Sequence, residues 1–270
     1  MVQVEQFLIK ESLQVFRKSL RLRRNQHKMS DPEETPPKKN RRKRRRRSSP
    51  SATTGNADRD SPVPQKKAAK PPGLTGPSKT ETALLPPFTG LSLEQIHVPS
   101  SRSECHDAVD EILAAGIGGF DTEAKPTFRA GQKSGGPHVV QFSLTDKAFI
   151  FQLHHHECEK ATSELIASTE VLKVGFGLQN DRGQIRHRLG IDLNHVLDLD
   201  QTFRKMGYRG QIGVRGAMGV LLKQCFKKSK STTTSNWARP NLSPRQLTYA
   251  ANDAYAALKI MEALELKGHL

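Results

Sequence analysis

The 270-residue sequence predicts a mixed α/β fold, in which a three-strand antiparallel meander is followed by β-α units and the resulting sheet is flanked by helices. Two observations carry this prediction. Three short apolar runs separated by turn residues follow one another between residues 116 and 153, and short apolar runs then alternate with helix-like spacing up to residue 225. A disordered basic tail is expected in front of this folded part.

The excess of positive charge is concentrated in the first part of the chain. Residues 1–100 contain 21 Lys and Arg against 9 Asp and Glu, whereas residues 101–270 contain 22 against 18, within a net charge of +16. A polyanion is the expected partner of such a chain, and nucleic acid is favoured over a membrane surface. No apolar run reaches the length of about 18 residues that spans a membrane, so we expect no membrane partner, and a cytoplasmic location in a bacterium or a nuclear one in a eukaryote.

The tail is expected to cover residues 1–87 and the folded domain residues 88–270. Residues 1–28 mix apolar and basic side chains, which is typical of a basic amphipathic helix, of a mitochondrial presequence, or of sequence upstream of a true start at Met29; we favour the last. Pro, Ser, Thr, Lys and Arg dominate the rest of the tail, so it can bury little surface. Within it, Lys38–Arg47 carries nine cations in ten positions, which indicates a nucleic-acid tether, an import signal or a solvated tail.

The meander occupies the first part of the folded domain. Helix-compatible apolar spacing at His106–Ala115 precedes the first strand, Gly116–Glu123. Pro137–Leu144 and Ala148–Leu153 are expected as the second and third strands, because both are rich in Val, Ile and Phe and a turn at 145–147 separates them.

The β-α units follow the meander. Helices are expected at Glu159–Thr169, Asp181–Leu189, Gln201–Met206 and Val214–Cys225, with strands at Val171–Gly177 and His195–Asp198 between them. Acidic side chains stand at several strand ends, where an open α/β sheet binds its ligands.

The last helix has the clearest sequence signals. Ser243 is suited to be its N-cap, Pro244 to be its first residue, and Gln246 completes a capping box. An apolar stripe at helical spacing then follows, consisting of Leu247, Ala251, Ala254, Leu258 and Met261. Tyr249 and Asp253 are one turn apart on another face, so both side chains can address one point.

The strand Gly116–Glu123 ends in two acids that share one face. Side chains alternate along a strand, so Asp121 and Glu123 lie one pleat apart on the same side. Two carboxylates beside an apolar strand repel one another and resist desolvation unless a positive charge lies between them. The pair therefore indicates either a divalent-metal site or a strand end that reaches solvent.

These segments together resemble the 3'-5' exonuclease superfamily with a ribonuclease H-like fold, in the branch whose third motif is Tyr-x-x-x-Asp. Asp121-Thr122-Glu123 matches motif one, Asp181 after the strand at 171–177 matches motif two, and Tyr249–Asp253 matches motif three. The segment Ser235–Pro240 is similar to the stretch before motif three in Werner-type and ribonuclease D-type domains. The likeness covers about residues 105–266, and the Ala that follows Glu123, where Werner-type domains commonly have Trp, resembles small bacterial members of the group.

The resemblance implies hydrolysis of phosphodiester bonds at 3' ends with two divalent ions, Mg²⁺ or Mn²⁺, which prefer hard oxygen ligands. Asp121 would bridge the two ions, Glu123 and Asp253 would complete one of the sites, and Asp181 would hold the second ion. Tyr249 would orient the attacking water, because a phenol whose ordinary pKa is near 10 positions water better than it deprotonates it.

A polar basic loop precedes the last motif and is the candidate for substrate contact. Its candidate nucleic-acid-binding residues are Lys227, Lys228, Lys230, Ser235, Asn236 and Trp237. Lysines in such a loop can contact phosphates and the indole can stack on a base, although solvation alone would also explain the composition. The expected substrate is single-stranded or 3'-recessed DNA or RNA.

Two other functions remain open from the sequence. One is a nucleic-acid-binding adaptor that retains the fold but no longer cuts; its signature would be a lost acid, and none of the five expected positions is lost. The other is a ribonuclease that trims RNA 3' ends, since a preference for RNA depends on contacts to the 2'-OH that spacing does not reveal. The sequence also leaves the oligomeric state open.

Overall fold

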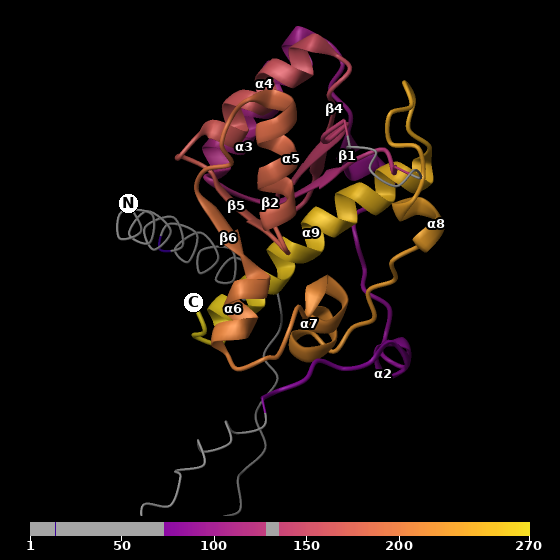
Figure 1. Cartoon of the computed structure of the whole chain (residues 1–270), viewed down its shortest axis with the longest axis vertical. Helices are drawn as coiled ribbons and strands as arrows, with labels where there is room; N and C mark the ends of the chain where they lie inside the picture. Colours follow the sequence, from indigo (N-terminus) through magenta and orange to yellow (C-terminus); the bar gives the residue numbers. More distant parts are fainter. Residues whose placement is uncertain (1–13, 15–72, 128–134) are drawn as a thin grey trace, which may run out of the picture.

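The computed structural model describes residues 73–127 and 135–270, together with residue 14, and its centre is a six-stranded sheet (Figure 1). The strands are β1 (Ile96–His97), β2 (Ile117–Glu123), β3 (Val139–Ser143), β4 (Ala148–Gln152), β5 (Leu172–Gly175) and β6 (Val196–Asp198). The helices are α2 (Lys79–Ala83), α3 (Arg102–Ala115), α4 (His156–Ala167), α5 (Gln179–Leu189), α6 (Leu199–Lys205), α7 (Gly213–Leu221), α8 (Lys230–Thr233) and α9 (Pro244–Leu266), with a 3-10 turn, η1, at Leu93–Gln95.

The sheet has the mixed topology that the sequence predicts. Its strand order is β1-β4-β3-β2-β5-β6, and β2, β3 and β4 are antiparallel neighbours, which confirms the meander. The pairs β2–β5, β5–β6 and β1–β4 are parallel. The predicted mixed α/β sheet flanked by helices is therefore confirmed, and β1 is an additional two-residue edge strand that was not predicted.

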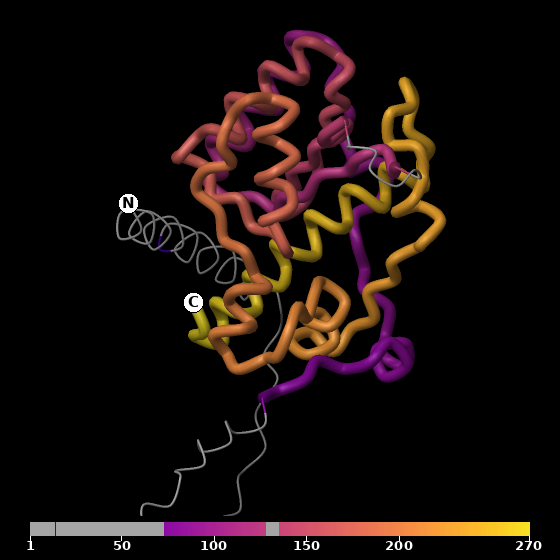
Figure 2. The backbone as a smooth tube through the Cα atoms, viewed as in Figure 1, coloured from indigo at the N-terminus to yellow at the C-terminus, as the bar shows by residue number. Residues whose placement is uncertain are grey.

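The sheet lies between two helical layers (Figure 1). Helix α9 crosses one face and packs on β2, β3, β4 and β5, while α3 and α4 cover the other face. Figure 2 shows the C-terminal helix running beside strands from the first half of the described chain. Strand β2 contributes to both layers, since Ile117 belongs to the core under α9 and Phe120 to the core under α3 and α4.

The starts of α3 and α9 follow their capping residues, and two boundaries differ from the predicted ones. Helix α3 begins at Arg102 because Ser101 forms a capping box with Glu104, so it starts four residues before the predicted helix. The capping box of Ser243 and Gln246 at the start of α9 is confirmed. Helix α7 ends at Leu221, whereas Cys225 forms a parallel bridge with Pro87.

Residues 73–87 are part of the folded structure, which corrects the expectation that this stretch belongs to a disordered tail. Helix α2 packs on α7, and Thr82 is buried there. Leu74 forms a bridge with Tyr208, and Phe88 N–H donates to the Cys225 carbonyl at 3.0 Å. The predicted disorder of the preceding residues and the start at Met29 concern positions outside the described residues, and they stay predictions.

Lys173 in β5 is a fully buried lysine. Its Nζ donates to three backbone carbonyl oxygens, those of Ser168 at 2.6 Å, Val171 at 3.0 Å and Asn194 at 3.0 Å. Burial lowers the pKa of Lys173 to about 7. Because all three acceptors are main-chain groups, this lysine ties the beginning of β5 to the loops on either side of it.

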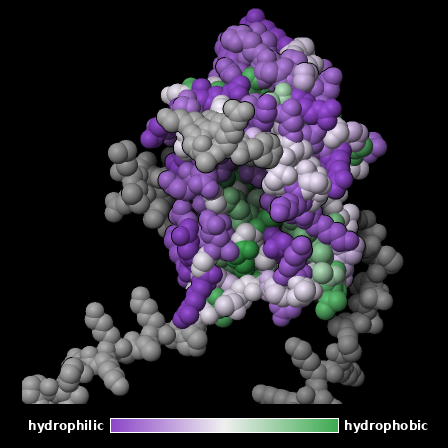
Figure 3. Space-filling model, turned by 45° about the vertical axis from the view of Figure 1, so that its right-hand side comes forward, coloured by the Kyte–Doolittle hydropathy of each residue, from purple (hydrophilic) through white to green (hydrophobic). Residues whose placement is uncertain are grey.

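The face of the domain seen in Figure 3 is mostly hydrophilic. Figure 3 shows one face on which hydrophilic residues surround a central hollow, with apolar surface in and below it. Within the described residues, no helix has the length and apolar character needed to cross a bilayer.

Candidate active site

Three carboxylates meet where β2 passes under α9. Asp121 and Glu123 lie on the same side of β2 as Ile117, the side that faces α9, and Asp253 comes from α9 itself. The closest oxygens of the three groups all lie within 4.8 Å of one another. The prediction that Asp121, Glu123 and Asp253 gather in one place thus agrees with the structure.

Gly119 permits this close approach of helix and strand. A Cβ atom at this position would overlap the carbonyl oxygen of Ala254 and the hydroxyl of Ser143. Only a residue without a side chain lets α9 approach β2 at this point. The glycine therefore determines how near Asp253 comes to Asp121.

Asp181 joins the group from the other side of β2. It lies in the first turn of α5, and one of its carboxylate oxygens accepts a hydrogen bond from the Thr122 hydroxyl. Asp181, Asp121, Glu123 and Asp253 line one cavity of about 490 Å³. Thr122 was not predicted as a site residue, although it lies between the two acids of motif one.

Lys228 places a positive charge against the acids. Its Nζ lies 2.8 Å from Asp253 Oδ2 and 5.9 Å from the centre of the Tyr249 ring. The loop lysine expected to contact nucleic acid is therefore located inside the acidic cavity. The sequence offered an indirect signal, because clustered buried carboxylates require a nearby cation.

Tyr249 lies one helical turn before Asp253, as the i, i+4 spacing predicts. Tyr249 lines the acidic cavity, and its hydroxyl is 2.8 Å from the Thr233 hydroxyl. Burial, with Asp253 nearby, raises the pKa of Tyr249. The side chain is consequently a neutral phenol over the physiological pH range, able to hold a water molecule but not to take its proton.

The carboxylates have strongly perturbed proton affinities. Burial, reinforced by the charges of Asp181 and Asp253, raises the pKa of Asp121 to about 8, and burial with Asp121 and Asp253 nearby raises the pKa of Glu123 to about 10. Burial also raises the pKa of Asp181 and Asp253, against the opposing effects of Thr122 and Lys228. Four acids that cannot all ionise next to one another form a site that favours added positive charge.

A divalent cation fits this donor set. All the candidate ligands are carboxylate oxygens, which suit hard ions, and three of them are near enough to share one ion. Of the lining residues that the structure describes, Lys228 is the one cation beside four carboxyl groups. Among the described residues, the acids on β2 and α9 form the one cluster of potential ligands of this size.

The remaining loop residues behave differently from one another. Lys227 and Lys230 are exposed, Ser235 Oγ lies 3.0 Å from Gln246 Nε2, and Asn236 Oδ1 accepts from Ala238 N–H at 3.1 Å. The expectation for Trp237 is wrong: its side chain is 1 % exposed, packs against Tyr249, and donates its N–H to the Thr233 carbonyl. A buried indole cannot stack on a base, so Trp237 supports α8 instead.

Two acids near β6 have structural partners. Asp198 caps α6 and also accepts from Gly177 N–H at 3.1 Å. Asp200 accepts a hydrogen bond from Gly213 N–H at 3.0 Å. It also lines the acidic cavity, which the sequence does not indicate. Both acids thereby attach the loops around the cavity to the sheet.

Comparisons with known proteins agree with this architecture. A family model described as a 3'-5' exonuclease matches residues 96–269. A 3'-5' exonuclease of Arabidopsis thaliana is 29% identical over 149 residues, which cover 54% of this chain and 52% of the relative, so the chain spans about half the length of that protein.

Two solved structures share the fold. The EXO domain of Aedes aegypti Nibbler has a TM-score of 0.56 at 21% identity, covering 66% of this chain and 90% of that domain. RNase D of Trypanosoma brucei, solved in complex with RNA U12, has a TM-score of 0.56 at 19% identity, covering 69% of this chain and 64% of the other. Because the family model matches well over half of the sequence, the chain belongs to the 3'-5' exonuclease family, whose members are divalent-metal dependent and have a ribonuclease H-like fold.

Proposed function

We propose that this chain is a 3'-5' exonuclease that hydrolyses phosphodiester bonds at nucleic-acid 3' ends and releases nucleoside 5'-monophosphates, with two Mg²⁺ or Mn²⁺ ions as cofactors. The observation that carries the proposal is the convergence of Asp121, Glu123 and Asp253 within 4.8 Å, with Asp181 in the same cavity. Single-stranded or 3'-recessed DNA or RNA is the proposed substrate.

Each side chain of the cavity would have a distinct role. Asp121, Glu123 and Asp253 would hold one ion, and Asp121 with Asp181 the other. Bound divalent ions supply Lewis acidity, which neutralises charge on the phosphate and lowers the pKa of water. The Tyr249 phenol would position the attacking water, and the Lys228 ammonium, which contacts Asp253 in this structure, would be near enough to attract the scissile phosphate.

The presence of all five motif residues in one cavity favours hydrolysis over the silent adaptor. An adaptor would need the basic loop but not four mutually repelling acids, which cost folding free energy when they are buried without function. An RNA-trimming activity remains a second candidate, supported by the likeness to the RNase D solved with RNA U12.

The decisive experiment uses single-stranded DNA and RNA labelled at the 5' end, incubated with Mg²⁺, Mn²⁺ or chelator. We expect stepwise shortening from the 3' end that requires metal, with nucleoside 5'-monophosphates as products. Asp121→Asn should leave the substrate intact. Metal-independent binding without shortening would support the adaptor, and a large ratio of RNA to DNA rates would identify an RNA-trimming enzyme.

A further inference from the structure

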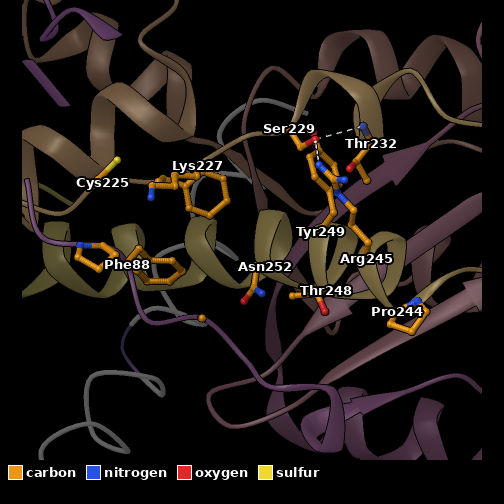
Figure 4. Close-up of a pocket in the computed structure, with 13 residues that line it drawn as sticks. Phe88, Cys225, Lys227, Ser229, Thr232, Pro244, Arg245, Thr248, Tyr249 and Asn252 are labelled. Atoms are coloured by element: carbon orange, nitrogen blue, oxygen red, sulfur yellow. Dashed lines mark hydrogen bonds between the residues drawn. The ribbon is translucent and has the colours of Figure 1, made fainter. Parts of the chain in front are cut away.

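A second cavity, of about 450 Å³, adjoins the acidic one. Figure 4 shows its lining side chains on α9, on the loop that begins at Cys225 and on the segment around Phe88. Tyr249 lines both cavities, and the loop residues are divided between them: Lys227 and Ser229 line the second cavity, whereas Lys228 lines the acidic one. Tyr249 and loop residues 227–229 therefore separate the two cavities.

The second cavity has a preformed apolar wall. Phe88 and Phe226 line it together, with ring centres 5.7 Å apart. Main-chain hydrogen bonds fix both segments, because Phe88 N–H donates to the Cys225 carbonyl at 3.0 Å and Cys225 N–H donates to the Pro86 carbonyl at 2.7 Å. A flat apolar ligand could enter without rearranging these walls.

Two positively charged residues line the cavity, at different ends of it (Figure 4). Lys227 and Arg245 are exposed there, and none of the described residues lining the cavity is acidic. The Arg245 guanidinium is oriented by a 2.8 Å hydrogen bond from Nη2 to Ser229 Oγ (Figure 4). Neither cation forms an ion pair with an acid within the described part of the chain, so both charges are available to a ligand.

We propose that this cavity binds a nucleotide unit, with the base against the half-buried Phe88, which Phe226 supports from behind, and a phosphate at Lys227 or at Arg245. A planar group stacks favourably on aromatic walls, and an anion is attracted by the cations that line the cavity. An uncharged apolar ligand would use the walls but not the cations, and a simple anion would use the cations but not the walls.

The nucleotide can come from two sources, the strand that is being cut or a free mononucleotide. The first source rests on the proposed exonuclease activity and would make the cavity a subsite for a nucleotide upstream of the scissile bond. The second does not depend on that activity. Both sources use the same base and phosphate chemistry.

Binding of adenosine 5'-monophosphate by the full chain tests the cavity without requiring hydrolysis. Calorimetry with chelator present compares wild type with Thr248→Trp, which fills the cavity from α9, and with Lys227→Ala, which removes one exposed charge. Lys160→Ala, at an exposed lysine on α4, is the matched control. We expect each cavity variant to weaken binding about 10-fold and the control to match wild type; thermal melting verifies that Thr248→Trp is folded.

Hydrolysis of a dinucleotide and of a twelve-nucleotide strand then distinguishes the sources. If the strand occupies the cavity, Lys227→Ala and Thr248→Trp lower the ratio of long-strand to dinucleotide rates, and Lys160→Ala does not. Weakened mononucleotide binding with an unchanged ratio identifies a free nucleotide. Unchanged binding and an unchanged ratio in both cavity variants would overturn the proposal, whereas a wild type that binds but never cuts would overturn the proposed function alone.

Discussion

The two ends of strand β5 bury charge in opposite ways. At its beginning, Lys173 is surrounded by three main-chain carbonyls that satisfy its three N–H groups. Beyond its other end, Asp181 joins Asp121, Glu123 and Asp253, and among the described residues that line this cavity Lys228 is the one cation. A buried lysine bonded to main-chain carbonyls connects parts of the fold, whereas buried carboxyl groups placed next to one another form a site for a ligand.

The largest expected effect is the loss of 3' hydrolysis when one acid of the cavity is replaced. Asp121→Asn keeps the shape of the side chain but removes a ligand shared by the proposed ions, so the rate of 3' hydrolysis should fall by at least about 10³-fold. The melting temperature of the metal-free variant should equal or exceed that of wild type, because a buried ionisable group beside three other acids is replaced by a neutral amide. Asp192→Asn, at an exposed partner of Arg186, is the control and should leave the rate unchanged. A clear loss of stability in Asp121→Asn would contradict the claim that the clustered acids do not stabilise the metal-free fold.

A substitution at Gly119 should push α9 away from β2. Gly119→Ala places a methyl group against the Ala254 carbonyl, and we expect a loss of about 3 kcal/mol in the free energy of unfolding, with a loss of activity. Gly183→Ala in α5 is the matched control, since a Cβ there meets nothing, and it should stabilise by about 0.5–1 kcal/mol. Urea denaturation measures both values, and equal stabilities would contradict the role given to Gly119.

Binding of a divalent metal at the acidic cavity should stabilise the folded chain, and its affinity should depend on pH. At about 100 times its dissociation constant, Mn²⁺ should add about 2.7 kcal/mol to the free energy of unfolding. Since the pKa of Asp121 is raised to about 8 and that of Glu123 to about 10, binding must displace protons. The affinity should therefore rise with pH between about 6 and 9. Calorimetry in buffers of different ionisation enthalpy measures the protons released, and a pH-independent affinity would contradict these pKa directions.

Lys173, at the beginning of β5, should make the stability of the fold depend on pH. Lys173→Met leaves three carbonyls without their donor and should cost about 2 kcal/mol of stability, with 3' hydrolysis retained. The pKa of Lys173 is about 7 in the folded chain, below its ordinary value of 10.5, so the unfolded chain binds more protons between these values. The stability of wild type relative to Lys173→Met should accordingly increase as pH rises from about 7 to 10. Chemical denaturation across this range tests the sign, and a decrease would refute it.

Local sequence signals predicted most of the fold. Capping residues and apolar periodicity located α9, and alternation located β2, β3 and β4. The same signals predicted that Asp121 and Glu123 share a face and that Tyr249 and Asp253 are one turn apart. These features depend on residues that are near one another in the chain.

Features that depend on distant partners could not be predicted in this way. Trp237 has the composition of a base-stacking residue, yet tertiary packing buries it against Tyr249. Lys228 has the same local context as Lys227, but the path of the loop directs one into the acidic cavity and the other into its neighbour. Residues 73–87 are rich in Gly, Pro, Ser and Thr, and their contacts with distant residues, with α7 and with Tyr208 and Cys225, place them on the domain.

The attachment of the segment before β1 has a practical consequence for truncation. Asn252 of α9 accepts from Leu91 N–H at 2.7 Å, and Gly90 lies so close that any side chain there would overlap the asparagine. A shortened chain that begins at residue 88 would lose the Pro86 and Pro87 contacts to Cys225 as well as α2. Deletions intended to isolate the catalytic unit should therefore retain residue 73 onward, so that the wall beside Tyr249 survives the cut.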